Sequence, residues 1–445
     1  MKISISGVRG IYGKDLTPKT ISTIIRAFSS YLKNKKGESY VINIIIGRDT
    51  RTSSEIIQSL IESELINCGI NVYSLNIAPT PIIFHESRKY DAGIIVTASH
   101  NPDEWNGLKL IIDGRGIFEQ ELDEIMSINN NQFSNIFGKF YHNTKYDYVV
   151  NVEKLLSSLI SIQKNDLYYG IDSGGGATCD YVDSLFKKLN NKFILINGNK
   201  FISSRTADPT TDNLNDLKTL IKSKQDMFFG FAFDLDGDRV VVVDNTGTKL
   251  DPDMTLLLCL ASTKVNLQYT KFVASLDTSL SIRDFTKSYN CTLDYSKVGE
   301  ANVVKKMIEV SADAGGEGSS AGFIIPKFNM CRDGFLASAI ISKIDKNTLN
   351  DCIGISSKYK IIRQKLLIEY NDISNIMNKI FDLLKPLSTE IINIDGVKAV
   401  IDDDSWILIR PSNTEHALRI SIESTPYKIN NLFDQISEKI MNLHE

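Results

Sequence analysis

One short pattern occurs three times in this chain of 445 residues and restricts the folds open to it. In each copy an apolar, strand-like run ends in an aspartate followed by a threonine or serine, at Asp49-Thr50, Asp172-Ser173 and Asp277-Thr278. A stretch with helical periodicity and a second strand-like run follow each time. Strand, helix and strand in this order form a βαβ unit, whose two strands run parallel. The sequence therefore predicts three related α/β domains with mixed, largely parallel sheets.

The boundaries of these units follow from apolar runs and turn residues. The predicted strand pairs are 41–46 with 72–77, 167–172 with 192–197, and 272–277 with 292–296. In the first unit, Thr52 and Glu55 predict a capping box at the start of a helix whose apolar face ends at Leu65. Gly69 is expected to end that helix.

The last eighty or so residues follow another pattern, which indicates an α+β domain. A helix is expected over 368–384, then short strands at 390–394, 399–401, 406–410 and 418–422, and a final amphipathic helix over 429–440. We predict four domains, at residues 1–150, 151–250, 251–365 and 366–445.

Composition excludes several classes of protein. A formal net charge of −4 gives no general attraction to nucleic acid. The longest apolar stretch, near 256–261, is too short to span a membrane, and residues 1–7 lack the apolar core of a signal peptide. The six cysteines show no Cys-x-x-Cys spacing, so we expect reduced thiols and a cytoplasmic protein.

Residues 92–102 read Ala-Gly-Ile-Ile-Val-Thr-Ala-Ser-His-Asn-Pro. An apolar β-branched run that stops at small polar residues and a proline predicts a buried strand, which delivers Ser99 and His100 to a turn. A serine at the tip of a strand is placed for covalent catalysis. The alternative is a serine that only caps the turn.

A second motif places three carboxylates, Asp234, Asp236 and Asp238, between two apolar runs. At about 4 Å, each like-charge pair costs roughly 1 kcal/mol in water and about 4 kcal/mol at an effective dielectric of 20, and a divalent cation relieves this repulsion. An EF-hand is excluded because Arg239 and Asn245 stand where it needs glycine and glutamate. A solvated acidic turn and a phosphatase motif with an Asp234 nucleophile stay open.

Two further loops carry ligand-binding side chains. The glycine-rich segment 315–322 presents Glu317, Ser319 and Ser320, which suit the hydroxyls of a sugar, although an unliganded turn is the alternative. A dinucleotide site is disfavoured there because a strand-like run and Pro326 follow where that motif requires a helix. Segment 410–415 begins with Arg410 and continues with hydroxyl and amide groups, a combination that holds phosphate, although a charged surface turn would look alike.

Taken in series, the segments 97–102, 234–239 and 410–415 resemble those of the α-D-phosphohexomutase family, which includes phosphoglucomutase, phosphomannomutase and phosphoglucosamine mutase. Segments 47–51, 79–81 and 297–299 also look like family segments, so the resemblance spans nearly the whole chain. It implies four domains around a central cleft. It also implies that phosphorylated Ser99 gives its phosphoryl group to a hexose phosphate, forming a hexose 1,6-bisphosphate intermediate. The other phosphoryl group then returns to the serine, so that the 1-phosphate and 6-phosphate isomers interconvert.

The resemblance implies roles for individual residues. Mg²⁺ would be bound by Asp234, Asp236, Asp238 and a phosphate oxygen on Ser99. The implied catalytic residues are Ser99, Lys109 as a general acid or base, Arg9 and His100. The implied substrate-binding residues are Arg239, Gly299, Glu317, Ser319, Ser320, Arg410, Ser412, Asn413, Thr414 and Arg419. The expected partners are small phosphosugars, with hexose 1,6-bisphosphate as activator, and the chain is expected to be a monomer or homodimer.

The choice of sugar stays open because the motifs disagree. Ala321 stands where many glucose and mannose enzymes have histidine, which removes one acid/base contributor and brings the loop closer to that of phosphoglucosamine mutases. Asn413, in contrast, is typical of the glucose and mannose enzymes. Two other functions stay open: a metal-dependent sugar phosphatase with an Asp234 nucleophile, and an inactive sugar-phosphate-binding protein.

Overall fold

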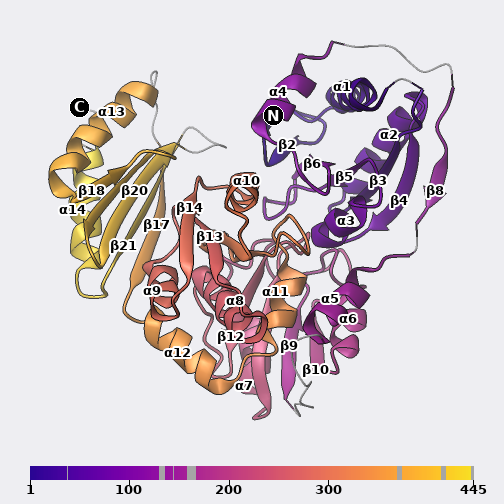
Figure 1. Ribbon diagram of the computed structural model, residues 1–445. Coiled ribbons are helices and arrows are strands. Elements are labelled where there is room, and N and C mark those ends of the chain that lie inside the picture. Colours follow the sequence, from indigo (N-terminus) through magenta and orange to yellow (C-terminus); the bar gives the residue numbers. More distant parts are fainter. Residues whose placement is uncertain are drawn as a thin grey trace.

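The computed structural model describes residues 1–37, 39–129, 136–143, 145–157, 167–367, 373–411 and 417–441. Within these residues the strands form four sheets, one in each of four domains. In Figure 1 the N-terminal domain, at the upper right, and the C-terminal domain, at the upper left, both lie above the two middle domains. This arrangement confirms the predicted fold class of three α/β domains and a C-terminal α+β domain.

The N-terminal sheet has the strand order β1-β2-β6-β5-β3-β4-β8, with β7 paired to β6. Strands β3, β4, β5 and β8 run parallel, while β6 runs antiparallel to β5. Ile44 and Ile46 pack with helices α1, α2 and α4, and Ile45 packs on the opposite face. The elements are β1 Lys2–Ser4, β2 Gly7–Ile11, α1 Pro18–Lys36, β3 Asn43–Arg48, α2 Ser54–Asn67, β4 Asn71–Ile77, α3 Thr80–Ser87, β5 Ala92–Val96, β6 Trp105–Ile112, β7 Arg115–Gly116, α4 Glu119–Ser127 and β8 Phe140–His142.

The second and third sheets repeat the centre of the first. Their strand orders are β10-β9-β11-β12 and β14-β13-β15-β16, in which the last strand alone is antiparallel. Strands β4-β3-β5-β6 of the first sheet have the same order and directions. The three domains are therefore related, and the loop between the third and fourth strand holds the same position in each.

The two middle domains share one apolar core, which includes helices α8 and α11. Helix α8 is buried along most of its length, because it lies between the second and third sheets. The elements of these domains are α5 Tyr148–Ser157, β9 Tyr168–Asp172, α6 Val182–Lys188, β10 Lys192–Ile196, α7 Asn215–Lys222, β11 Met227–Phe233, β12 Val240–Asp244, α8 Pro252–Leu267, β13 Lys271–Ser275, α9 Leu280–Ser288, β14 Thr292–Ser296, α10 Glu300–Val310, β15 Ala314–Glu317, β16 Gly322–Ile324, α11 Gly334–Ile341 and α12 Lys346–Ser356.

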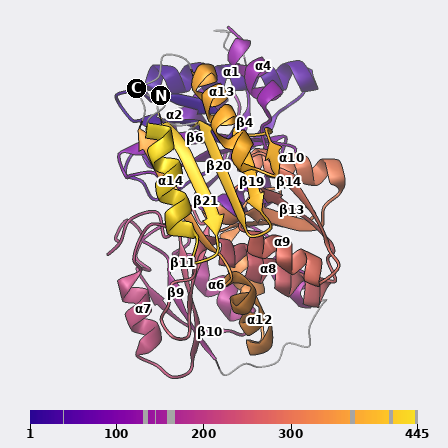
Figure 2. The ribbon, with the colours of Figure 1, turned by 90° about the vertical axis from the view of Figure 1, so that its left-hand side faces the viewer.

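The C-terminal sheet is wholly antiparallel, in the order β17-β21-β20-β19-β18, and α13 and α14 cover one face of it (Figure 2). Its strand β17 was not anticipated and extends across the boundary predicted at residue 365. Of the helix expected over 368–384, residues 373–384 are helical and 368–372 lie outside the described residues. The elements are β17 Lys360–Leu367, α13 Ile373–Leu384, β18 Glu390–Ile392, β19 Val397–Asp402, β20 Ser405–Pro411, β21 Ala417–Ser424 and α14 Ile429–Met441.

The capping box expected at Thr52 and Glu55 is wrong. Helix α2 begins at Ser54 with Ser53 as its N-cap, so the spacing that the box requires is not met, and no side chain caps the helix. The Ser54 hydroxyl instead donates to Asp49, and Glu55 forms an ion pair with Arg48.

Two expectations from composition can be compared with the structure. All six cysteines are free thiols. Across the described ranges, no helix combines the length and the apolar character needed to cross a membrane.

Candidate active site

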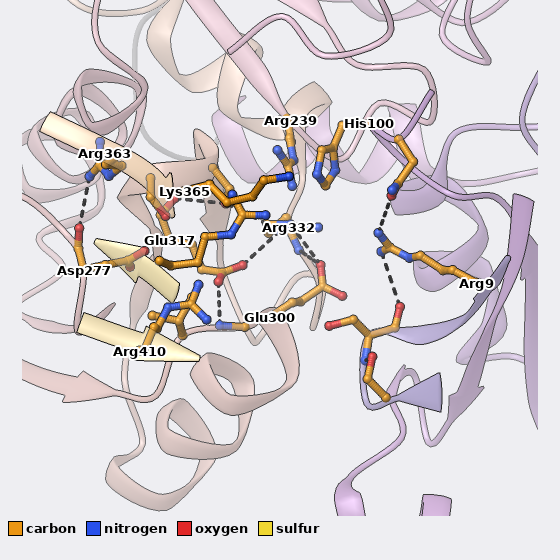
Figure 3. A pocket seen from close by; sticks show the side chains of 18 of the residues that line it. Arg9, His100, Arg239, Asp277, Glu300, Glu317, Arg332, Arg363, Lys365 and Arg410 are labelled. Atoms are coloured by element: carbon orange, nitrogen blue, oxygen red, sulfur yellow. Dashed lines mark hydrogen bonds and ion pairs between the residues drawn. The ribbon is translucent and has the colours of Figure 1, made fainter. Parts of the chain in front are cut away.

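A cavity of about 650 Å³ lies where the four domains meet, and each domain contributes side chains to its wall. The loops between the third and fourth strands of the three α/β domains all reach it or lie directly behind it. Figure 3 shows Arg332 near the middle of the cavity, with Arg9 on one side and Arg410 on the other.

Ser99 lies in the loop between β5 and β6, as the sequence predicts. It is buried and has a positive φ of 54°, which is uncommon for a residue other than glycine and often marks a functional site. The buried Arg51 guanidinium fixes this turn by donating to the backbone carbonyls of Ser99, Asn101, Pro102 and Trp105 at 2.6–3.0 Å. Arg51 therefore holds the backbone of the serine turn in place.

The three aspartates lie in the equivalent loop between β11 and β12, and all three are buried. They offer ligand atoms that lie within 4.8 Å of one another, so this group could hold a metal ion. The Ser99 hydroxyl donates to Asp234 Oδ2 at 3.1 Å, which places the serine at the edge of the carboxylate cluster. Thr80, from the N-terminal domain, donates to Asp236 Oδ2 at 2.7 Å.

The chemistry of this cluster fits a divalent cation. Asp236 Oδ1 and Asp238 Oδ1 are buried and have no hydrogen-bond partner among the described residues. A buried carboxylate oxygen without a partner is costly, and oxygen-only ligand sets suit Mg²⁺. The Lys109 ammonium lies 3.2 Å from Asp236 Oδ2 and 2.9 Å from Asp238 Oδ2 and neutralises part of the charge.

The pKa values in the cluster diverge. Burial and the neighbouring carboxylates of Asp236 and Asp238 raise the pKa of Asp234 well above its usual range. Burial also disfavours the Asp238 carboxylate, but Arg332 and Lys109 outweigh it and hold its pKa well below the usual range. For Lys109, burial opposes the charge but the two aspartates raise its pKa, so it is a cation in this arrangement.

Arg9, His100 and Arg239 border the cluster and line the cavity. Arg9 donates to Asn101 Oδ1 at 2.9 Å, and burial lowers the pKa of its guanidinium to about 10. His100 Nδ1 lies 3.4 Å from Ser99 Oγ. Burial, followed by the charges of Arg239 and Arg9, lowers the pKa of His100 well below its usual value, so the ring is neutral.

The predicted sugar loop follows β15 and also lines the cavity. Glu317 is buried, and its Oε1 accepts from the Gly299 backbone at 2.7 Å, so two predicted residues contact each other. Gly299 has a φ of 118°, in the region that favours glycine. Ser319 and Ser320 line the same wall. Ala321 is fully buried against apolar residues that include Leu214 and Val241.

The C-terminal sheet contributes cations to the opposite wall. Lys365 on β17 pairs across strands with Arg419 on β21, which pairs in turn with Arg410 on β20. All three side chains line the cavity. The predicted residues Ser412, Asn413 and Thr414 lie outside the described residues.

Family models match four successive parts of the chain. They are described as phosphoglucomutase/phosphomannomutase α/β/α domains I, II and III and C-terminal domain, over residues 1–135, 146–247, 251–357 and 372–439. The chain belongs to the phosphoglucomutase/phosphomannomutase family. The four matched domains correspond in order to the four sheets described above.

Individual members of the family match along nearly their full length. A phosphoglucosamine/phosphogalactosamine mutase from Sulfurisphaera tokodaii is 30% identical, covering 97% of both chains. A phosphoglucomutase/phosphomannomutase from Thermococcus kodakarensis is 29% identical, covering 94% of this chain and 93% of the relative. The crystal structure of a family protein from Burkholderia thailandensis shares the fold, with a TM-score of 0.81 at 23% identity, covering 98% of this chain and 97% of that one.

Among the residues of the site in this family member to which the sequence assigned no role, three have contacts that shape it. They are Arg51, which holds the serine turn, Arg332, which contacts both the aspartate loop and Glu317, and Lys365 on β17. A signal existed for Lys365, because Arg363 and Lys365 alternate with Ile362 and Leu366 as on a half-buried strand. Arg51 lies in segment 47–51, which resembles a family segment, but its partners are distant in sequence and that segment does not indicate its role. No local pattern pointed to Arg332.

Proposed function

We propose that this protein is a phosphohexomutase, which interconverts the 1-phosphate and 6-phosphate of glucose, mannose or glucosamine through phosphorylated Ser99. The single observation that carries the proposal is the 3.1 Å contact between the Ser99 hydroxyl and Asp234 in a buried three-carboxylate cluster. That contact places the serine beside a group suited to a divalent cation, at one end of a cavity whose other end is cationic.

In the proposed reaction, a free hydroxyl of the sugar phosphate attacks the phosphorus on Ser99. A new oxygen–phosphorus bond forms and the bond from phosphorus to Ser99 Oγ breaks. The sugar hydroxyl loses its proton, and Ser99 Oγ gains one. The product is a hexose 1,6-bisphosphate. In the second transfer its other phosphoryl group returns to Ser99, so the phosphorylated enzyme is regenerated.

Asp234, Asp236 and Asp238 would hold Mg²⁺, which when bound would neutralise charge on the transferring phosphoryl group. Lys109 is placed to donate a proton or to stabilise negative charge, because the two aspartates keep it protonated. Arg9 and Arg239 add positive charge beside the serine. The neutral His100 ring is available as an acceptor or donor next to Ser99.

The other end of the cavity suits the phosphate that does not react. Arg410, Arg419 and Lys365 form a row of positive charge on adjacent strands, and guanidinium groups bind phosphate with two parallel hydrogen bonds. Glu317 and Ser319, between the two ends, would bind sugar hydroxyls. We include Ser412, Asn413 and Thr414 in the phosphate site on the strength of the sequence motif alone.

Both alternative functions have less support. An Asp234 nucleophile would need an unobstructed carboxylate oxygen, whereas its Oδ2 accepts from the Ser99 hydroxyl and its Oδ1 accepts from the Arg239 backbone N–H at 3.1 Å. An inactive binding protein has no need to retain the serine, the carboxylates and the cations together. Relatives named as phosphoglucosamine/phosphogalactosamine mutase and phosphoglucomutase/phosphomannomutase support small phosphosugars as the partners. The cytoplasmic location and the monomer or homodimer stay predictions from the sequence.

The proposal is tested by incubating the purified protein with glucose 1-phosphate, mannose 1-phosphate and glucosamine 6-phosphate, each with Mg²⁺ and hexose 1,6-bisphosphate, and following the isomers by phosphorus NMR. We expect at least one substrate to be isomerised, and the ratio of kcat/KM values then ranks the sugars. Release of inorganic phosphate without isomerisation would favour the phosphatase, and binding without turnover would favour the inactive protein.

A further inference from the structure

One buried arginine joins the aspartate loop to the sugar loop. Arg332 Nη2 donates to Asp238 Oδ2 at 2.8 Å, and Nη1 of the same guanidinium donates to Glu317 Oε2 at 2.9 Å. The two carboxylates belong to the second and third domains. Figure 3 shows this side chain in the wall of the cavity, where a ligand would meet it.

The position of Arg332 is built into the fold. Its backbone N–H donates to Glu300 Oε2 at 2.9 Å, and its Nε lies 3.4 Å from the same oxygen. Its aliphatic stem crosses Gly322 so closely that a Cβ on this glycine would lie 2.3 Å from Arg332 Cδ. The side chain is 9% exposed, so its charge is largely shielded from water and its ion pairs are strong.

The same guanidinium therefore contacts both the proposed metal site, at Asp238, and the proposed sugar site, at Glu317. Asp238 Oδ2 accepts from both Lys109 and Arg332, while Asp238 Oδ1 has no hydrogen-bond partner among the described residues and lies 3.8 Å from Arg239 Nε. A divalent cation bound to Asp238 would share that carboxylate with Arg332 and repel the guanidinium. A sugar phosphate in the cavity would bring negative charge that attracts the guanidinium away from Asp238.

We propose that Arg332 couples the divalent-cation site to the sugar-phosphate site, so that each ligand raises the affinity for the other. The proposal rests on the function proposed above and assigns Arg332 as a positioning residue. Each ligand competes with the ion pair between Arg332 and Asp238. The ligand that binds first weakens this ion pair, so the free-energy cost of breaking it is smaller for the ligand that binds second. Because binding free energies are linked, the two enhancements must be equal in size.

The coupling can be measured by titrating Mg²⁺ in a calorimeter into the Ser99→Ala protein, in which phosphoryl transfer is blocked. Titrations are made without sugar and with saturating glucose 1-phosphate or, separately, glucosamine 6-phosphate. We expect at least one sugar phosphate to tighten Mg²⁺ binding about 5-fold or more, the lower end of typical coupling between two sites. Mn²⁺ binding followed by electron paramagnetic resonance gives a second readout.

Two substitutions in this background should act in opposite directions on the sugar-free protein. Arg332→Gln removes the competing cation, so Mg²⁺ should bind several-fold more tightly and sugar phosphate should add little. Glu317→Gln releases Arg332 from its second partner, so the guanidinium should bind Asp238 more strongly and Mg²⁺ should bind several-fold more weakly. Arg332→Lys retains the positive charge but cannot donate to Asp238 and Glu317 with two separate nitrogens. It should therefore still compete with Mg²⁺ for Asp238 but lose most of the coupling.

Arg26→Gln is the matched control, because Arg26 also pairs with a carboxylate, that of Glu64, on helices of the N-terminal domain. It should change neither affinity, and circular dichroism should show that every variant is folded. Equal Mg²⁺ affinities in the Arg332→Gln and Glu317→Gln proteins, or unchanged coupling without Arg332, would overturn the proposal. A wild-type protein that isomerises no sugar phosphate overturns the proposed function instead, and opposite shifts in sugar-free Mg²⁺ binding would still support the competition at Asp238.

Discussion

The two ends of the cavity are charged in different ways. At the aspartate end, charges of both signs come from three domains and lie in contact, as Lys109 and Arg332 do with Asp238. At the other end, Lys365, Arg419 and Arg410 place like charges opposite one another on adjacent strands, which destabilises a sheet in the absence of an anion. The first end thus combines charges of both signs in direct contact, whereas the second gathers positive charge on adjacent strands, which suits a ligand of negative charge.

The largest effect is expected from removing the hydroxyl that is proposed to react at the aspartate end. Ser99→Ala should lower kcat by three orders of magnitude or more, because no other described side chain holds a hydroxyl in the same contact with Asp234. Steady-state kinetics with the preferred sugar phosphate measure the loss, and the melting temperature should stay close to that of the wild type. Ser127→Ala, at the exposed end of α4, is the control. A Ser99→Ala enzyme with near wild-type turnover would exclude Ser99 as the residue that carries the phosphoryl group.

The crowding of carboxylates gives the next prediction. Asp234→Asn should lower kcat by about two orders of magnitude or more and weaken Mg²⁺ binding, because it removes one proposed ligand. It should leave the melting temperature unchanged or higher, because burial and Asp236 and Asp238 make a charge at this position unfavourable. Calorimetric unfolding measures the melting temperature, and Mg²⁺ titration measures the affinity for the cation. A clearly lower melting temperature would mean that the Asp234 carboxylate stabilises the fold.

The cationic end should respond through substrate affinity. Arg410→Gln and Lys365→Gln should each raise KM by about 10-fold and leave kcat within a few-fold, since a hydrogen bond to a charged group contributes about 1.5–3 kcal/mol. Lys360→Gln, on the exposed start of the same strand, is the control and should change neither constant. A fall in kcat with unchanged KM would show that these side chains act on the reacting phosphate instead.

The smallest effect concerns the contact between the C-terminal sheet and the third domain, where Glu423 lies. Burial raises the pKa of Glu423 to about 7, although Ser279, Leu280 and Trp406 donate hydrogen bonds to it. The folded state therefore binds a proton more tightly than the unfolded state, where the pKa is about 4.3. Between about pH 4.5 and 7, this group should lower the free energy of unfolding by at most about 1.4 kcal/mol per unit rise in pH.

Denaturant unfolding at several pH values tests this assignment. Glu423→Gln should flatten the pH dependence over that window, while Glu438→Gln, exposed on α14, should leave it unchanged. An equally steep dependence in both variants would assign it to other groups.

The sequence predicted the elements whose pattern is local. Strands β5 and β11 contain no polar residue, so they could be recognised, and with them the loops that carry Ser99 and Asp234. The helix start near Thr52 was wrong because the helix begins at Ser54, where a tertiary contact that a local pattern cannot contain is made: Asn106 on β6 donates to the hydroxyls of Ser53 and Ser54. Strand β17 was missed because only its middle alternates as a half-buried strand does, and adjacent apolar pairs, Ile361-Ile362 and Leu366-Leu367, interrupt the pattern.

The contacts between domains could not be predicted in the same way. Arg332 reaches Asp238 and Glu317 only after two sheets have packed together, and Arg51 reaches the Ser99 turn through the N-terminal sheet. A row such as Lys365, Arg419 and Arg410 requires the strand register, which an isolated sequence does not contain. Local patterns therefore identified the chemical groups, and packing determined how their charges are balanced.

The most direct test of the account is to follow a phosphoryl group onto and off the serine. The protein is incubated with radiolabelled hexose 1,6-bisphosphate and Mg²⁺, freed of ligand, digested and mapped by mass spectrometry, and a second portion is exposed to unlabelled hexose 6-phosphate. We predict that the label lies on the peptide containing Ser99 and passes to the sugar. A label on Asp234, or a label on Ser99 that does not transfer, would contradict the account.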